Sequence, residues 1–306
     1  MLKFNRKNKK KENEIRSATL KQSQEAILNK KTAFVIQEAY KTARTNIIFS
    51  VAGAVDNACK VIVVTSASPG EGKTTSTINL AMTFAQTGAR VLLVDGDLRK
   101  PRVHQYLGVL KTNGLSTVLS NQQKFDDVVF RDLKEGMDVL ASGSIPPNPA
   151  ELLSSDAMGG MLDEIKQKYD YIFFDTPPVT VVTDAAALSK FVDGVIMVVR
   201  EGYTNHESIE HAINLLNIAE AKVLGFFVND VEVSNAGYSG YRSRGYGYGR
   251  GYGYRYNYRY NYRYGGRDYG EKAEMSIDDT GAVTTEQDTK PVPEEMNTDV
   301  NNSDIL

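Results

Sequence analysis

The chain has 306 residues, of which 41% are hydrophobic, so it can bury a core as one large domain or two small ones. A single cysteine, Cys59, excludes an internal disulfide and a cysteine-based metal site. The net charge of -2 hides three charged regions. Residues 1–31 carry ten Lys or Arg against three Glu, residues 238–269 carry seven Arg against one Asp, and residues 271–306 carry ten acidic residues against two Lys.

Short apolar strands alternate with helical periodicity between residues 32 and 235. The predicted order opens with a helix at 32–52, a strand at 60–65, a helix at 74–87 and a strand at 90–94. It continues with a strand at 137–140, a helix at 150–168 and a strand at 169–174, and ends with a helix at 183–190, a strand at 194–199, a helix at 208–219 and a strand at 222–228. All-apolar strands of this kind are buried on both faces of a parallel sheet. The pattern predicts a doubly wound, mostly parallel α/β domain.

Composition divides the chain into four regions: a basic N-terminal segment at 1–31, the α/β domain at 32–235, a Tyr/Arg/Gly-rich cluster at 236–270 and an acidic tail at 271–306. Residues 238–269 hold twelve of the seventeen tyrosines but no Val, Ile, Leu, Phe or Met. Without aliphatic burial to offset the entropy of ordering, both C-terminal regions are predicted to be disordered. No apolar stretch follows the basic N-terminus and no long apolar run occurs, so we expect a cytoplasmic protein.

The strongest motif lies between a strand and a helix, in the sequence ASPGEGKT at residues 67–74. It matches a phosphate-binding loop (P-loop) in which Ala replaces the first Gly. The backbone N–H groups and the helix N-terminus are expected to bind phosphates, Lys73 to reach the outer ones, and the Thr74 hydroxyl to ligate Mg²⁺. The expected nucleotide-binding residues are Ser68, Pro69, Gly70, Glu71, Gly72, Lys73, Thr74, Thr75 and, further along the chain, Arg99.

Two aspartate motifs follow at the ends of predicted strands, VLLVDGDLRKP and YIFFDTPP. Ligand groups of a doubly wound sheet lie at this edge. Carboxylate and hydroxyl oxygens suit Mg²⁺, so Thr74, Asp175 and one of Asp95 and Asp97 are predicted to hold or orient the ion. The other aspartate of the pair would accept a proton from an attacking hydroxyl. We favour Asp95 as the base and Asp97 as the metal ligand, which makes Lys73, Asp95, Asp97 and Asp175 the predicted catalytic set.

These motifs, together with EAYKTARTNI, GSIPPNPAELLSS, YDYIFFDTPPVTVVTDA and the tyrosine cluster, resemble the bacterial tyrosine kinases. These are P-loop NTPases of the MinD/ParA-like superfamily, and the likeness covers about residues 35–264. The resemblance implies a non-specific protein-tyrosine kinase of capsule or exopolysaccharide synthesis that uses ATP and Mg²⁺. Walker A then corresponds to residues 67–74, Walker A′ to Asp95, Asp97 and Arg99, and Walker B to Asp175. The implied autophosphorylation sites are Tyr238, Tyr241, Tyr246, Tyr248, Tyr252, Tyr254, Tyr256, Tyr258, Tyr260, Tyr262, Tyr264 and Tyr269.

The resemblance also implies partners. The oligomerisation motif of the family corresponds to Glu38, Lys41 and Arg44, where Lys41 replaces an arginine and loses its bidentate fork. It implies a ring-like homo-oligomer when unphosphorylated. It further implies a transmembrane polysaccharide co-polymerase adaptor that recruits and activates the kinase at the inner face of the plasma membrane, protein substrates of polysaccharide assembly, and a protein-tyrosine phosphatase.

Two other functions are considered. A MinD/ParA-like switch ATPase shares the fold and Walker A′, but such proteins usually carry a second lysine where this chain has Ser68, and they lack a tyrosine tail. A nucleic-acid-binding or condensate-forming protein could use the alternating Arg and Tyr of the tail, although no nucleic acid is expected for this domain. The remaining tyrosines, Tyr40, Tyr106, Tyr169, Tyr171 and Tyr203, lie in the ordered pattern and are predicted to be packed rather than modified.

Overall fold

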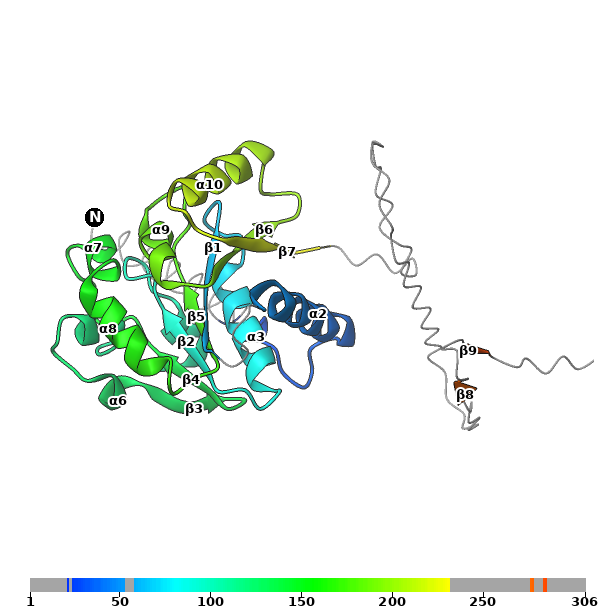
Figure 1. Cartoon of the computed structure of the whole chain (residues 1–306), viewed down its shortest axis with the longest axis horizontal. Coiled ribbons are helices and arrows are strands. Elements are labelled where there is room, and N and C mark those ends of the chain that lie inside the picture. The colour runs from blue at the N-terminus through cyan, green and yellow to red at the C-terminus, as the bar shows by residue number, and fades with distance from the viewer. Residues whose placement is uncertain (1–20, 22–23, 53–57, 232–275, 278–282, 285–306) are drawn as a thin grey trace, which may run out of the picture. The chain divides into compact units, whose positions relative to one another are not determined.

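The computed structural model describes residues 21, 24–52, 58–231, 276–277 and 283–284 (Figure 1). The chain separates into two units, Met1–Tyr238 and Ser239–Leu306. In the second unit, the described residues form one short antiparallel pair, β8 (Ser276–Ile277) and β9 (Val283–Thr284). The sequence prediction contains no strand there. The tail tyrosines, most of the acidic tail and most of the basic N-terminal segment lie outside the described residues.

The first unit is built on a seven-stranded sheet with the order β3-β4-β2-β5-β1-β6-β7. Its strands are β1 (Lys60–Ser66), β2 (Val91–Asp95), β3 (Phe130–Lys134), β4 (Met137–Leu140), β5 (Tyr171–Asp175), β6 (Gly194–Arg200) and β7 (Val223–Asn229). All neighbours are parallel except β3, which pairs antiparallel with β4. The predicted doubly wound sheet is therefore confirmed. The strand β3 is missing from the prediction because its side chains are half-buried or exposed and it has no apolar run.

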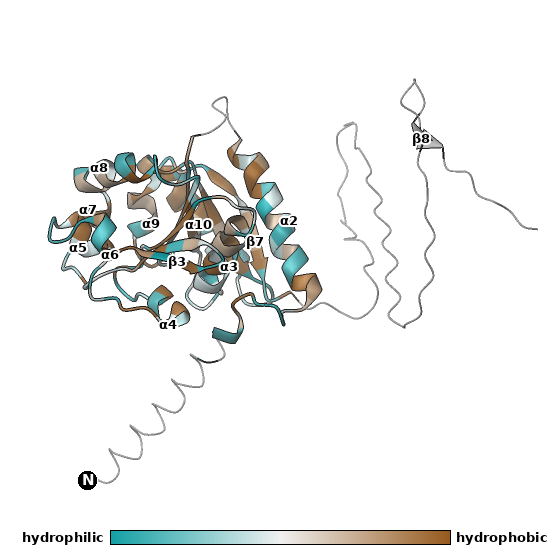
Figure 2. Cartoon of the chain, turned by 90° about the horizontal axis from the view of Figure 1, so that it is seen from below, coloured by the Kyte–Doolittle hydropathy of each residue, from teal (hydrophilic) through white to brown (hydrophobic). Residues whose placement is uncertain are grey.

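Helices cover both faces of the sheet. One face carries α2 (Phe34–Val51), α3 (Lys73–Ala85) and α4 (Val103–Leu107). The opposite face carries α5 (Leu115–Leu119), α6 (Phe125–Val128), α7 (Pro149–Leu153), α8 (Asp156–Ile165), α9 (Asp184–Ala187) and α10 (His206–Ile218). In Figure 2 the hydrophobic strands lie between these helices, as expected for a sheet buried on both faces.

Two predicted helices are wrong in extent. The segment 150–168 forms two helices rather than one, because the backbone of Ser155 is extended. The Ser154 hydroxyl donates to the carbonyl oxygen of Glu151 and the Ser155 hydroxyl donates to that of Leu152, which ends the first helix. The segment 183–190 is shortened to α9 and a 3₁₀ turn at Ser189–Phe191. The short helices α4, α5 and α6 carry too little periodic sequence to be predicted.

The folded unit extends N-terminal of residue 32. Ile27 and Leu28 are buried, and Asn79 of α3 bonds this segment twice: its Oδ1 accepts the Leu28 N–H at 2.9 Å and its Nδ2 donates to the Ala26 carbonyl at 3.1 Å. Asn79 is itself 1% exposed, so these bonds satisfy a polar group that would otherwise be costly to bury.

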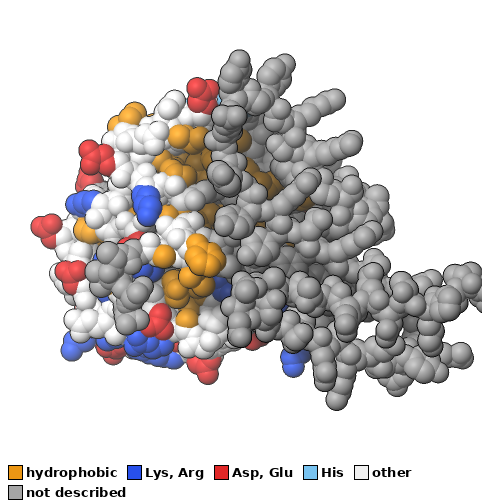
Figure 3. Space-filling model, turned by 45° about the vertical axis from the view of Figure 1, so that its right-hand side comes forward, with side chains coloured by type: hydrophobic (Ala, Val, Ile, Leu, Met, Phe, Trp, Pro, Cys, Tyr) orange, Lys and Arg blue, Asp and Glu red, His pale blue; other side chains and the backbone are white. Residues whose placement is uncertain are grey.

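Exposed hydrophobic side chains are concentrated on α2 (Ile36, Ile48 and Phe49) and on the edge strand β7 (Phe226 and Val228). Figure 3 shows such side chains gathered in patches on one face. In β7 the exposed positions flank Phe227, whose ring stacks on Tyr40 of α2 at 5.2 Å. Because side chains alternate along a strand, α2 covers one face of β7 and leaves the other open.

Candidate active site

The register of the parallel sheet brings the P-loop and two aspartates to one edge. Asp175 at the end of β5 lies opposite Val64 of β1 and opposite Asp95 at the end of β2. Neighbouring strands are about 4.8 Å apart, so the loops that follow β1, β2 and β5 share one small volume. This is the edge at which doubly wound proteins bind their ligands.

The P-loop has the backbone of an anion-binding turn. Gly70 and Gly72 both have a φ of +86°, a left-handed conformation that favours glycine, and α3 begins directly afterwards at Lys73. A Cβ atom on Gly72 would lie 1.9 Å from the Nδ2 of Asn229. The N-terminus of α3 and the loop N–H groups together form the kind of site that binds phosphate.

Lys73 and Thr74 meet on Asp175. The Lys73 ammonium lies 3.1 Å from Asp175 Oδ1, and the Thr74 hydroxyl donates to Asp175 Oδ2 at 2.8 Å. The Thr77 hydroxyl, which sequence reasoning missed, lies one turn further along α3 and 3.3 Å from Asp175 Oδ1. Burial raises the pKa of Asp175, although the charge of Lys73 and the bond from Thr74 lower it. Three of the predicted site residues therefore form one buried cluster.

Asp95 is buried and poorly satisfied. Its Oδ2 accepts the backbone N–H of Val103 at 3.2 Å, whereas its Oδ1 has no hydrogen-bond partner among the residues that the structure describes. Burial raises the pKa of the Asp95 carboxyl well above its usual value, and the nearby charges of Asp175 and Asp97 raise it further. Such a carboxyl binds a proton tightly and has one oxygen free to receive it.

Asp97 has a different environment. It is 7% exposed, and its Oδ1 accepts the backbone N–H groups of Arg99 at 3.3 Å and Lys100 at 2.9 Å. The guanidinium of Arg99 is directed to the fully buried Asp184, with Nε 3.0 Å from Oδ2 and Nη2 3.0 Å from Oδ1. Arg99, predicted as a nucleotide contact, thus joins the loop after β2 to α9.

The turn after β6 and the last residue of β7 hold the P-loop by hydrogen bonds, which the motif alone did not indicate. The carboxylate of Glu71 is 0% exposed; Oε2 accepts the Ser68 N–H at 2.9 Å and Oε1 accepts the Thr204 hydroxyl at 2.7 Å. Asn229 Nδ2 donates to the Glu71 carbonyl at 3.0 Å, and the Tyr203 hydroxyl donates to the Pro69 carbonyl at 3.2 Å. Tyr203, Thr204 and Asn229 come after predicted strands, and this position was the only sign in the sequence that they lie near the P-loop.

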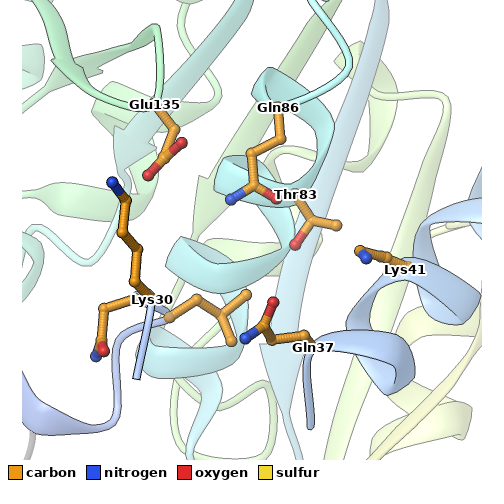
Figure 4. A pocket seen from close by; sticks show the side chains of 8 residues that line it. Lys30, Gln37, Lys41, Thr83, Gln86 and Glu135 are labelled. Atoms are coloured by element: carbon orange, nitrogen blue, oxygen red, sulfur yellow. The ribbon is translucent and has the colours of Figure 1, made fainter. Parts of the chain in front are cut away.

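The residues of the predicted oligomerisation motif make contacts within the chain. Lys41 pairs with Glu38 at 2.7 Å, and Arg44 donates to the carbonyl of Thr83 on α3 at 2.6 Å. Beside them lies a pocket of about 180 Å³ at the end of α3 remote from the P-loop. Figure 4 shows its polar lining, which includes Lys30, Gln37, Lys41, Thr83, Gln86 and Glu135.

The prediction that the five tyrosines of the ordered region are packed is wrong for one of them. Tyr40 and Tyr169 are buried and Tyr106 and Tyr171 are partly buried, but Tyr203 is 55% exposed. It lies in the turn between β6 and α10. In the part of the chain that the structure describes, no helix is long and apolar enough to cross a bilayer.

A P-loop at the head of a buried helix, with carboxylates at the ends of neighbouring parallel strands, places the protein among the P-loop nucleoside triphosphatases. The family described as AAA domain matches residues 59–224. The chain is 43% identical over 204 residues to the tyrosine-protein kinase YwqD of Bacillus subtilis, covering 67% of this chain and 85% of that protein.

It is also 34% identical over 207 residues to the putative tyrosine-protein kinase CapB of Staphylococcus aureus, covering 67% of this chain and 90% of that protein. The solved kinase domain of the Escherichia coli tyrosine kinase ETK superposes with a TM-score of 0.59 at 30% identity, covering 67% of this chain and 80% of that domain. The chain belongs to the family of bacterial tyrosine-protein kinases.

Proposed function

We propose that this chain is an ATP-dependent protein-tyrosine kinase that phosphorylates its own tail and other proteins. The observation that carries the proposal is the cluster at the sheet edge. The P-loop residues Lys73 and Thr74 share the buried Asp175, beside Asp95 with its unpartnered oxygen. Membership of the tyrosine-kinase family supports phosphate transfer rather than hydrolysis alone.

In the proposed complex, loop residues 68–73 and the N-terminus of α3 bind the phosphates of ATP. Lys73 leaves Asp175 for the outer phosphates. Oxygen atoms of Thr74, Asp97 and Asp175 suit Mg²⁺ as ligands. A cation also fits this edge because the negative charges of Asp95, Asp97 and Asp175 repel one another. When bound, Mg²⁺ neutralises charge on the phosphates.

Asp95 is the proposed base. As the phenol oxygen bonds to the γ-phosphorus, the bond from that phosphorus to the β–γ bridging oxygen breaks, ADP leaves, and the phenol proton passes to Asp95 Oδ1. A raised pKa makes Asp95 a stronger base, but it must first be deprotonated. The transfer rate is therefore expected to rise with pH until Asp95 is ionised.

The attachment point of the tail supports self-phosphorylation. The strand β7 is parallel to β6 and ends at Asn229, whose side chain bonds the P-loop, so the last described residues of the first unit lie near the proposed catalytic edge. A chain of about 30 residues with the dimensions of a flexible linker would span roughly 30 Å, which is enough to reach this site or that of a neighbour. The unmodified segment 238–269 carries +6 from seven Arg and one Asp, whereas twelve phosphates add about -18 to -24.

This change of sign is proposed to dissociate a ring of subunits formed through Glu38, Lys41 and Arg44. The Arg44 contact with Thr83 would open to make that interface. The names of the relatives support a role in capsule or exopolysaccharide synthesis. In that setting we propose that a membrane adaptor recruits and activates the kinase, and that a protein-tyrosine phosphatase reverses its phosphorylation.

The proposal is tested by following both fates of the γ-phosphate. The full chain with Mg²⁺ and labelled ATP should label a synthetic peptide of residues 238–269 on tyrosine, faster than it releases inorganic phosphate. Hydrolysis without peptide labelling, even with the cytosolic part of an adaptor present, would instead support a switch ATPase. Transfer between subunits is tested by mixing a Lys73→Ala chain with one whose tail tyrosines are Phe; absence of label on the Lys73→Ala tail would exclude it.

A further inference from the structure

The turn between β6 and α10 presents a tyrosine beside the P-loop. Tyr203 is the one exposed tyrosine among the described residues. Gly202, just before it, has a φ of +68°, and apart from its two chain neighbours no described residue has an atom within 4 Å of a Cβ position there, so the turn is tight but not packed. Tyr203 is therefore accessible to a modifying site in a way that the other described tyrosines are not.

The hydroxyl of Tyr203 has a defined task in the unmodified protein. It donates a hydrogen bond to the carbonyl oxygen of Pro69, at the start of the P-loop. The next residue, Thr204, donates to the buried carboxylate of Glu71 in the same loop. Two consecutive side chains of the turn therefore hold the P-loop by hydrogen bonds in which the turn is the donor.

A phosphate on Tyr203 would remove the first of these bonds. The phenol loses its proton when it is esterified, and the phosphate oxygens are acceptors at neutral pH, as is the Pro69 carbonyl. The guanidinium of Arg200 lies 5.4 Å from the centre of the Tyr203 ring and pairs with Asp230 at 2.7 Å. This guanidinium could pair with a phosphate on Tyr203, and it would then give up its ion pair with Asp230, the residue after β7.

We propose that Tyr203 is a phosphate acceptor separate from the tail cluster, and that its phosphorylation detaches the turn from the P-loop and weakens ATP binding. The inference rests on the proposed kinase function. In the transfer, the Tyr203 oxygen bonds to the γ-phosphorus of ATP, the bond to the β–γ bridging oxygen breaks, the phenol proton passes to the base, and ADP leaves. The added negative charge then opposes the phosphates of the next ATP.

The acceptor role is tested by peptide mapping of the full chain after incubation with Mg²⁺ and ATP. Tryptic cleavage after Arg200 and Lys222 gives a peptide of residues 201–222 that contains Tyr203 as its only tyrosine. We expect a phosphate on Tyr203 of this peptide, absent from Tyr203→Phe and from Lys73→Ala chains. Phosphate on the tail peptides but never on residues 201–222 would overturn this inference and leave the proposed kinase intact. Phosphate on no peptide would overturn both.

The regulatory role is tested by ATP binding to the unphosphorylated full chain in a calorimeter. Tyr203→Glu adds a negative charge and removes the donor, and we expect it to raise the Kd for Mg-ATP about tenfold. Tyr203→Phe removes only the donor and should change the Kd less than about threefold. Equal affinity of the Glu variant and the wild type would contradict the proposed effect on ATP binding.

Discussion

Replacing Asp95 by Asn should stabilise the nucleotide-free protein while abolishing phosphate transfer. In the wild type, Asp95 is fully buried, its Oδ1 has no partner within the described part of the chain, and the charges of Asp175 and Asp97 disfavour its ionised form. An unsatisfied buried polar atom costs about 1–3 kcal/mol. An amide keeps the acceptor for the Val103 N–H and places a donor near the two carboxylates. We therefore expect a gain in stability of about 1–3 kcal/mol at pH 7, or roughly 2–12 °C in Tm for a domain of this size.

The pH dependence gives the sharper test. Because the pKa of Asp95 is raised in the folded state, the folded protein binds this proton more tightly than the unfolded chain does. The contribution to stability is therefore present at low pH and is lost as the pH rises through the raised pKa. Asn does not titrate, so the advantage of Asp95→Asn should be small near pH 4 and largest at neutral pH.

The assay is urea denaturation of the metal-free and nucleotide-free full chain at several pH values. Asp97→Asn is the matched control. Asp97 accepts two backbone N–H groups, so removal of its charge should lower the stability of the protein by about 0.5–1 kcal/mol. If Asp95→Asn destabilised the protein at pH 7, or gave the same shift at pH 4 and pH 7, the account of the buried carboxylate would be wrong.

Two further substitutions test the loops of the site. Gly72→Ala should cost about 2–3 kcal/mol of stability in urea denaturation and weaken ATP binding, because alanine is strained at this positive φ and its Cβ would displace Asn229. The control Gly88→Ala, at a φ of +87° with open space around it, should cost only about 1 kcal/mol. Equal costs for the two variants would refute the contact between residue 72 and Asn229. Arg99→Ala should lower the free energy of unfolding by about 2–3 kcal/mol, because it leaves the buried Asp184 unpaired. Adding Asp184→Asn should recover at least half of that loss. A double variant as unstable as Arg99→Ala alone would contradict this pairing.

The sequence predicts the central elements of the fold because their signals are local. The strand before the P-loop is an unbroken apolar run, the glycines mark the turn, and a periodic helix follows. The same strand ends lead to Asp95 and Asp175, which the register then brings opposite each other. Parallel strands that are buried on both faces thus predict both the sheet and the edge at which its ligands bind.

The remaining features depend on contacts between distant residues. Nothing local to Arg99 indicates that its guanidinium lies against Asp184, 85 positions later. The carboxylate of Glu71 lies inside a loop whose usual role is to bind phosphate, so its bond to Thr204 also required the structure. Tyr203 lies in a turn and is 55% exposed, and the hydrophobic pattern of the sequence does not show how a turn residue packs.

We propose that the Lys73, Thr74 and Asp175 cluster transfers phosphate from ATP to tyrosine. The most direct measurement is the intact mass of the full chain after incubation with Mg²⁺ and ATP, beside a Lys73→Ala chain treated in the same way. We expect a ladder of added phosphates that map to tyrosines, most of them at positions 238–269, and no ladder for Lys73→Ala. An unchanged wild-type mass in the presence of an adaptor, while ATP is still consumed, would contradict the account.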